Sequence, residues 1–277
     1  MKIKVWGCRG SLPAPGAHTL RYGGHTTCLE IRDRAGRVIV VDAGSGLRNL
    51  GRALLRDKQL RHLHMIITHS HWDHLMGFPF FSPAYFSRYL ITLCGGPKAS
   101  NALYGYLHSQ MKAPYFPVDF SVMKARFQFG HRTCRIGGIH LRAIPLNHPN
   151  GGYGFEFSEA GKRFVFLTDN ELDAPHPGGL QRADYLAACR GADLLFHDAQ
   201  YTDAEYKLTR GWGHSTFASA TDLAIEAGVK KFGLFHHDPD RTDAALDKQV
   251  EFCRRRIAKA GSKVKCFAAA EGMVIEM

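Results

Sequence analysis

The chain has 277 residues, of which 45% are hydrophobic, and it carries a formal net charge of +11. This length can bury most of the apolar surface of one large domain, and we expect a single domain over residues 1–277. The start, MKIKVWGCRG, lacks the apolar core of a signal peptide, and no run reaches the roughly 20 apolar residues of a membrane helix. These features predict a soluble, cytoplasmic protein with no membrane partner, and the positive charge favours an anionic partner.

Seven cysteines are scattered along the chain without a CxxC pair. An odd number at such spacing is more typical of reduced, buried thiols than of a disulfide framework or a zinc ribbon. The seven are Cys8, Cys28, Cys94, Cys134, Cys189, Cys253 and Cys266.

Short apolar runs bounded by turn residues predict strands in the first half of the chain. The strands are expected at residues 3–6, 27–32, 38–42, 64–68 and 90–94, with helices near residues 47–56 and 100–111. Many aromatic residues lie between Gly77 and Phe120. Most of them are expected in the core, and the alternative is a pocket wall that stacks a base.

The second half of the chain repeats this order of strands followed by helices. Strands are expected at residues 139–144, 153–157, 164–168, 194–197 and 231–235, and helices at residues 179–190, 216–227 and 243–258. A turn of Glu159, Ala160 and Gly161 between two apolar strands predicts a hairpin. We therefore predict an α/β fold in which two sheets stack between outer helices, a four-layered αββα sandwich.

The segment IITHSHWDHLMG, residues 66–77, concentrates metal-ligand side chains at the end of a predicted strand. His69, His71, Asp73 and His74 occupy four of six consecutive positions. Burying so many unpaired polar groups would be costly, so a core role explains them poorly. On a loop at the carboxyl end of a strand, His69 and His71 can hold one metal ion while Asp73 and His74 face a second.

Three further ligand candidates also follow predicted strands: His148 in PLNHPNGGYGF, Asp169 in FVFLTDN and His236 in FGLFHHDP. A single histidine is more often a surface or core residue than a ligand, and the neighbouring His237 is an alternative to His236. Their shared position at strand ends nevertheless favours one common site with the first cluster.

These segments resemble the metallo-β-lactamase-fold hydrolases, and among them the phosphodiesterase branch that includes ribonuclease Z. The resemblance extends from VWGCRGSLPAPG, GGHTTCLEI and VVDAGSG through THSHWDHLMG to LFHHDP. It implies two metal ions that Asp169 bridges. The residues that match the ligands of one ion are His69, His71 and His148, and those that match the ligands of the other are Asp73, His74 and His236. Such ligands suit zinc best, with manganese or iron as alternatives.

The resemblance also implies catalytic roles. A hydroxide held between the two ions would attack phosphorus, oriented by Asp73 and Asp169. The stretches LLFHDAQYTDAEY and GWGHSTF resemble the branch's acid and HxT-type histidine motifs, in which a carboxylate orients the histidine that protonates the leaving oxygen. Here these residues would be Asp198 and His214. The alternative is that His214 caps the helix that begins near Ser215.

Departures from the family patterns bear on the substrate. Ribonuclease Z of the usual kind carries a long arm that grips transfer RNA between the positions matching His148 and Asp169, and the short interval here fits a single hairpin. Phosphonate-pathway cyclic phosphodiesterases of the branch carry a cysteine-bearing structural metal site that has no counterpart in this sequence. His25 stands where relatives usually show asparagine, a change that the sequence does not explain.

We therefore expect a dinuclear metal-dependent phosphodiesterase that acts on a small or cyclic phosphodiester, such as a cyclic nucleotide, rather than on transfer RNA. The alternatives are a thioesterase or lactonase of the same fold, a ribonuclease that acts on RNA ends, and a nucleic-acid-binding protein whose metal ions only stabilise the fold. Salt-sensitive binding without turnover would identify the last of these. The sequence leaves open whether nucleic acid is a partner and whether a homodimer completes the pocket.

Overall fold

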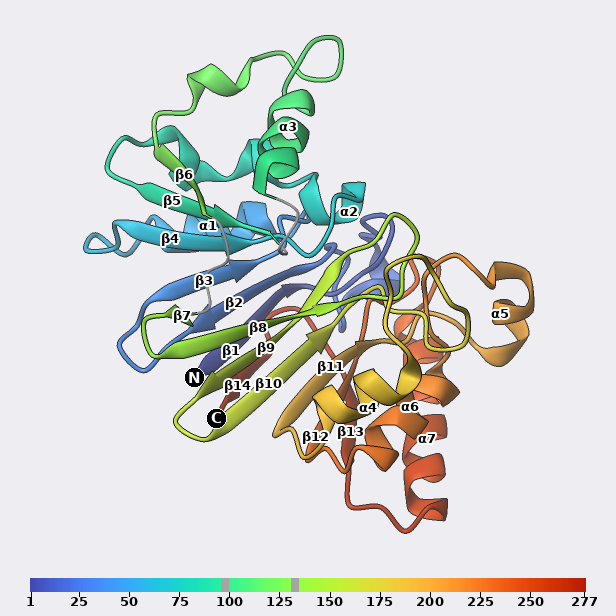
Figure 1. Cartoon of the computed structure of the whole chain (residues 1–277). Helices are drawn as coiled ribbons and strands as arrows, with labels where there is room; N and C mark the ends of the chain where they lie inside the picture. Colours follow the sequence, from blue (N-terminus) through green and yellow to red (C-terminus); the bar gives the residue numbers. More distant parts are fainter. Residues whose placement is uncertain (96–99, 131–134) are drawn as a thin grey trace.

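The structure is a computed structural model that describes residues 1–95, 100–130 and 135–277. Two seven-stranded sheets form the centre of the fold (Figure 1). The first sheet has the order β14 (Val274–Glu276), β1 (Lys2–Gly7), β2 (Cys28–Arg32), β3 (Val38–Val41), β4 (His62–Ile66), β5 (Leu90–Cys94) and β6 (Arg126–Gly130). The second has the order β13 (Lys265–Ala268), β12 (Lys231–Phe235), β11 (Leu194–Asp198), β10 (Lys162–Leu167), β9 (Tyr153–Glu159), β8 (Ile139–Pro145) and β7 (Arg135–Ile136). Strands β3 to β6 and β10 to β13 are parallel.

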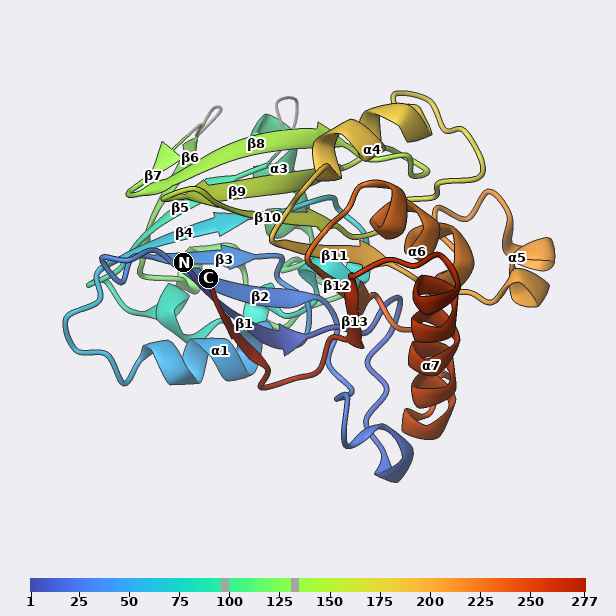
Figure 2. The same ribbon diagram turned by 90° about the horizontal axis from the view of Figure 1, so that it is seen from below.

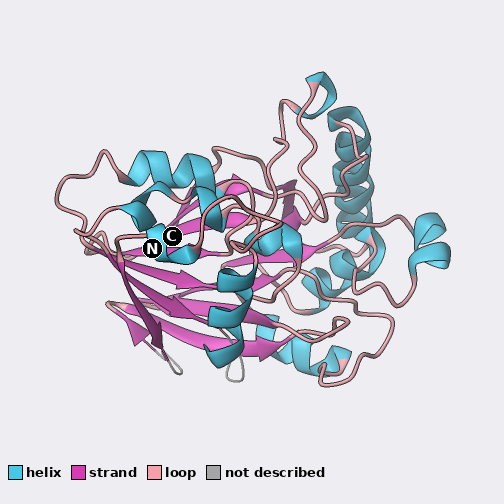
Figure 3. Cartoon of the chain, turned by 90° about the horizontal axis from the view of Figure 1, so that it is seen from above, coloured by secondary structure: helices cyan, strands magenta, loops and turns pink. Residues whose placement is uncertain are grey.

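Helices lie on the outer faces of both sheets, which gives the four predicted layers (Figure 2 and Figure 3). The first sheet carries α1 (Leu47–Leu54) and α3 (Ser100–Ser109), and the second carries α4 (Arg182–Cys189), α6 (Phe217–Glu226) and α7 (Asp243–Lys259). The connections contain α2 (Trp72–Leu75), α5 (Asp203–Thr209) and the 3₁₀ turns η1 (Ala17–Thr19), η2 (Phe78–Phe80), η3 (Ser82–Tyr85) and η4 (Phe120–Val122).

The alternation of side chains along the strands explains this layering. In β3, Val38 and Val40 pack in one core cluster with Leu50 of α1, whereas Ile39 packs in another cluster with Phe157 of the opposite sheet. A strand that is buried on both faces reads as a continuous apolar run, which is how VIVV appears in the sequence. The αββα sandwich is therefore confirmed.

Every strand and helix predicted from the sequence is present, with ends that differ by a few residues. The predictions missed β6, β7, β13, β14, α2 and α5. These elements are short, so they contain too little periodicity to be recognised. One of them changes the topology, because β14 pairs with β1 and so places the last strand of the chain in the first sheet.

The predicted hairpin joins β9 to β10 and fills the interval between His148 and Asp169. Its turn consists of Ala160 and Gly161, both with positive φ (49° and 75°), while Glu159 belongs to β9. Two left-handed residues in a two-residue loop are typical of a tight β-hairpin.

The expectation that most aromatic residues between Gly77 and Phe120 lie in the core is not borne out, whereas the expectation of buried thiols is. Phe78, Phe81 and Tyr89 are buried, but five others are exposed: Phe80, Phe86, Tyr104, Tyr106 and Tyr115. The six cysteines in the described ranges are buried, and Cys134 lies outside those ranges. Within the same ranges, no helix combines the length and the apolar character needed to cross a membrane. The cytoplasmic location stays a prediction.

Candidate active site

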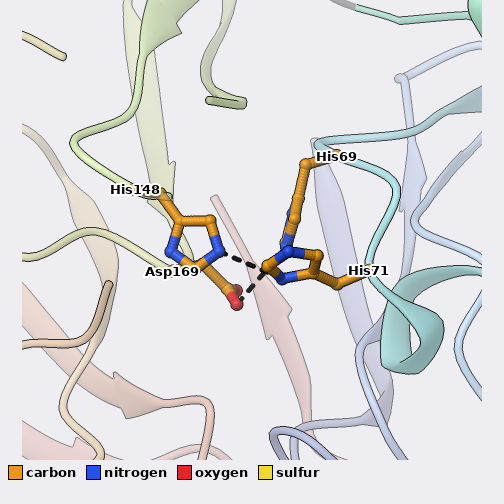
Figure 4. A group of neighbouring side chains, drawn as sticks. All are labelled: His69, His71, His148 and Asp169. Carbon is orange, nitrogen blue, oxygen red and sulfur yellow. Dashed lines mark hydrogen bonds and ion pairs between the residues drawn. The ribbon is translucent and has the colours of Figure 1, made fainter. Parts of the chain in front are cut away.

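The seven side chains that the sequence proposes as metal ligands come together where strands of both sheets end. They form two groups that share Asp169, and in each group the ligand atoms lie within 4.8 Å of one another. One group is His69, His71, His148 and Asp169, drawn in Figure 4. The other is Asp73, His74, Asp169 and His236. The grouping matches the two ligand sets that the resemblance implies, and the binding of ions by these groups stays a prediction.

The fold brings the ligands together because parallel neighbours end at the same edge of a sheet. β10, β11 and β12 are adjacent and parallel, and Asp169, Asp198 and His236 stand at their carboxyl ends. Asp169 and His236 have left-handed backbones, with φ of 50° and 59°, which are uncommon outside glycine. Such strain is found mainly at functional sites, where the surrounding structure maintains it.

Protein groups fix the orientation of several imidazoles. Each of three histidines holds Nδ1 against an acceptor, in the pairs His74 and Asp42 Oδ2 (2.8 Å), His236 and Gln200 Oε1 (2.8 Å), and His148 and the Gly213 carbonyl (3.0 Å). Because Nδ1 donates to these acceptors, Nε2 faces the site and is the ring atom available to bind a metal ion. Asp42 and Gln200 were not among the residues that the sequence singled out.

Two histidine nitrogens that face the site have no hydrogen-bond partner among the described residues, as expected of atoms that bind a metal ion. His69 Nε2 and His74 Nε2 are buried and make no hydrogen bond within the described part of the chain, although His74 Nε2 lies 3.2 Å from Asp169 Oδ1. His148 Nε2 lies 3.1 Å from His71 Nδ1. Buried polar atoms are normally paired, and a cation between these atoms would satisfy them. The number of histidine nitrogens and carboxylate oxygens in the two groups fits two divalent ions.

The electrostatics favour the protonation states that metal binding requires at Asp169 and His148 but not at His74. Burial lowers the pKa of His74, but the carboxylates of Asp73, Asp169 and Asp42 outweigh it and raise the pKa well above its usual range. Burial would raise the pKa of Asp169, but the nearby His236, His74 and His69 outweigh it and hold the pKa well below its usual range. Burial lowers the pKa of His148 to about 4. The carboxylate is therefore ionised and this imidazole neutral at pH 7, ready to act as ligands.

Beside the second group lies the proposed acid pair. His214 Nδ1 donates to Asp198 Oδ2 over 2.6 Å, both residues are buried, and the His214 ring stacks on that of His236 with 4.9 Å between centroids. Burial lowers the pKa of His214, but the Asp198 carboxylate outweighs this effect and raises the pKa to about 9. The alternative role of His214 as a helix cap is wrong, because Thr216 is the N-cap of α6.

A buried carboxylate that the sequence did not single out organises the loop before His214. The side chain of Glu171 is fully buried and accepts four hydrogen bonds. Oε1 accepts from Tyr206 Oη (2.7 Å) and from the amide of Gly211 (2.7 Å), while Oε2 accepts from the amide of Gly213 (2.8 Å) and from His176 Nε2 (2.7 Å). Because the Gly213 carbonyl in turn accepts from His148, Glu171 connects this loop to the first ligand group.

Two histidines left open by the sequence have structural partners. His237 Nε2 donates to the carbonyl of Ala269 and does not belong to either ligand group, so the geometry favours His236 as the ligand candidate. His25 Nδ1 lies 3.1 Å from Ser45 Oγ, and its Nε2 lies 3.1 Å from Asn49 Nδ2. His25 thus joins two segments of the first half through polar contacts outside the ligand groups.

Comparison with known proteins places this site in a family. Residues 37–237 match the family model described as the beta-lactamase superfamily domain. The chain belongs to the beta-lactamase superfamily. It is 26% identical over 252 residues to ribonuclease Z of Synechococcus sp. (strain WH7803). This match covers 72% of the present chain and 75% of the ribonuclease.

Solved structures of the superfamily share the whole fold. The metallo-β-lactamase fold protein YhfI of Bacillus subtilis superimposes with a TM-score of 0.70 at 17% identity, covering 100% of this chain and 99% of that one. A diphosphatase from the PhnP family superimposes with a TM-score of 0.67 at 18% identity, covering 100% and 97%. The family relationship supports the predicted metal-dependent hydrolase of the phosphodiesterase branch.

Proposed function

We propose that this protein is a dinuclear metal-dependent phosphodiesterase that hydrolyses a small or cyclic phosphodiester, such as a cyclic nucleotide. The observation that carries the proposal is the junction of two ligand groups through Asp169, with the Asp198–His214 pair directly beside them. A site that only stabilised the fold would have no use for a buried, carboxylate-held imidazole at its edge.

Each ligand group would hold one divalent ion, zinc by the chemistry of its donors, with manganese or iron as alternatives. When bound, a pair of such ions polarises a phosphoryl oxygen and generates a hydroxide nucleophile at neutral pH. The protein positions the reacting groups around them. Asp73 Oδ2 accepts from the amide of Ser11 (2.9 Å) and lies 3.0 Å from His236 Nε2, which fixes it to orient the attacking water together with Asp169.

His214 supplies the proton that the departing oxygen needs. Asp198 holds its Nδ1, so Nε2 is the atom that donates. Without this proton an alkoxide would have to leave unprotonated, which is slow near pH 7. This acid pair favours phosphodiesters over the thioesters of the alternative, because a thiolate leaves without assistance.

The names of the relatives agree with phosphate chemistry, since they include a ribonuclease Z and a diphosphatase. A ribonuclease that acts on RNA ends is therefore a second candidate. The β9–β10 hairpin argues against transfer RNA, because it fills the interval in which ribonuclease Z of the usual kind carries its long arm. A homodimer that completes the pocket stays a prediction.

The test is hydrolysis of bis(p-nitrophenyl) phosphate by the protein reconstituted with zinc or manganese. We expect metal-dependent turnover that Asp73→Ala abolishes. Asp203→Ala, which removes an exposed carboxylate on α5, is the matched control and should leave the rate unchanged. Two bound ions per chain without any diester hydrolysis would contradict the proposal, and thioesters and lactones would then be assayed.

A further inference from the structure

A cavity of about 600 Å³ begins at His69 and extends toward α3. We name it the α3 pocket. Its walls include residues 67–70 after β4, residues 150–152 before β9, Tyr153 at the start of β9, and Ala102 and Tyr106 of α3. This volume lies within the range of sites that enclose a small molecule.

The α3 pocket borders the first ligand group. His69 lines it directly, and its opposite wall continues the loop that carries His148. The two walls are close together, because a Cβ added at Gly152 would lie only 3.1 Å from the Cβ of His69. A phosphoryl group held at the ligands would therefore have its ester-linked group next to this cavity.

The lining indicates what kind of group fits. Tyr106 and Tyr153 supply aromatic rings, while Ser70 and Asn150 supply a hydroxyl and an amide. Among the described residues of the lining there is no Asp, Glu, Lys or Arg. Aromatic rings with a few neutral polar groups suit an uncharged, hydrogen-bonding ring system rather than a second anionic group or a plain acyl chain.

We propose that the α3 pocket binds the base of a nucleoside whose phosphodiester is cleaved at the ligand groups. This inference rests on the proposed function and adds the class of substrate to it, a nucleoside phosphodiester. Base–aromatic stacking tolerates different bases, because every base has a π-face, so the pocket selects for a base without strict choice among the four.

A substitution on α3 can fill the pocket without disturbing the ligands. Ala102 lines the pocket and is exposed, so Ala102→Trp adds a large ring inside the cavity from a helix surface. Ser109→Trp adds the same ring to the same helix at an exposed position that is not part of the lining. The pair therefore separates occupancy of the pocket from the general effect of a new tryptophan.

The experiment is calorimetric titration of the zinc-loaded protein with inorganic phosphate, ribose 5-phosphate and AMP. We expect AMP to bind more tightly than ribose 5-phosphate by about 5- to 150-fold, the range that stacking of one base gives. Ala102→Trp should remove most of this advantage and leave the affinity for phosphate unchanged, while Ser109→Trp should change neither. Equal binding of AMP and ribose 5-phosphate, or an equal loss of phosphate and AMP affinity in Ala102→Trp, would overturn the proposal.

These outcomes are independent of turnover. If the AMP advantage is present but no diester is hydrolysed, the proposed function fails and the pocket assignment survives. If diesters are hydrolysed but AMP binds no more tightly than ribose 5-phosphate, the pocket assignment fails and the proposed function survives.

Discussion

Glu171 offers the sharpest test of how the site is held together. Its carboxylate accepts two hydrogen bonds at each oxygen, and both glycine amides that it holds belong to the loop leading to His214. Burial would raise the pKa of Glu171, but the hydrogen bonds from Tyr206, Gly211, His176 and Gly213 outweigh it and keep the pKa below its usual value. The group is therefore a buried anion, and Glu171→Gln removes the charge with little change of shape.

The size of the effect follows from counting acceptors. A glutamine amide keeps one oxygen and replaces the other with NH₂, so two of the four donors would face another donor. Each buried donor left unsatisfied costs roughly 1–3 kcal/mol, which gives roughly 2–6 kcal/mol before the loop relaxes. Opening of the loop to water limits this cost, and about 2 kcal/mol lost from the position of His214 corresponds to about a 30-fold slower reaction.

The assay combines kinetics with amide exchange. For Glu171→Gln we expect kcat for 2′,3′-cyclic AMP, whose leaving group is an alkoxide, to fall by at least about 30-fold, with a smaller change in KM. Amides in residues 206–213 should exchange faster, because the carboxylate no longer holds them. Tyr206→Phe, which removes one donor, should give a smaller loss. Asp203→Asn changes the same charge at an exposed position of α5 and should have no effect.

Two results would refute this reasoning. One is Glu171→Gln protein with kcat within about threefold of the native value and unchanged exchange in residues 206–213. The other is a global fall in melting temperature with normal kcat per folded molecule. In that case Glu171 would stabilise the fold without positioning His214.

Three further predictions concern the same site. His214→Ala should slow cleavage of 2′,3′-cyclic AMP by about 10²- to 10⁴-fold. Cleavage of bis(p-nitrophenyl) phosphate should be affected far less, because p-nitrophenolate leaves without a proton. Equal losses of rate for the two substrates would exclude the acid role of His214. Removal of metal by a chelator should lower the melting temperature, because free zinc at 100 times its Kd stabilises the folded chain by about 2.7 kcal/mol. An unchanged melting temperature would argue against bound ions. In Gly213→Ala, the new Cβ would lie 1.9 Å from His148 Nδ1, so metal content measured by mass spectrometry should fall. Gly211→Ala has a similar φ of +90° with no described atom within 4 Å of the new Cβ, and equal metal loss in both variants would point to backbone strain instead.

The ligand candidates could be predicted from the sequence because each leaves a local signal. His69 and His71 lie in one dense polar cluster after an apolar run, and Asp169 and His236 follow buried strands. Parallel strands end at a common edge, so a residue's position at a strand end is enough to bring it to the site. Asp198 was predicted from the family resemblance alone, and in the structure it stands at the end of β11.

The groups that orient the ligands leave no such signal. Asp42 is 32 residues from His74, Gln200 is 36 residues from His236, and Glu171 is 42 residues from Gly213. No periodicity or spacing relates residues at these separations, and only the folded chain makes them neighbours. Asp42 is the last residue of a predicted strand and so has a position like those of the ligand candidates, and position alone could not separate an orienting carboxylate from a liganding one.

Backbone strain connects these observations to the expected role of metal. Asp42, Asp169 and His236 all have left-handed backbones, with φ of 62°, 50° and 59°. Each such residue costs of order 1–3 kcal/mol and persists only where the surroundings enforce it. At Asp42 two hydrogen bonds hold this conformation, because the carboxylate accepts from the amide of Thr68 (2.7 Å) and from His74 Nδ1 (2.8 Å). Asp169 accepts a hydrogen bond from Thr168 Oγ1 (2.5 Å) and lies 3.2 Å from both His74 Nε2 and His236 Nε2. We expect bound cations to add to this compensation. We therefore expect removal of metal ions to weaken the fold as well as the reaction.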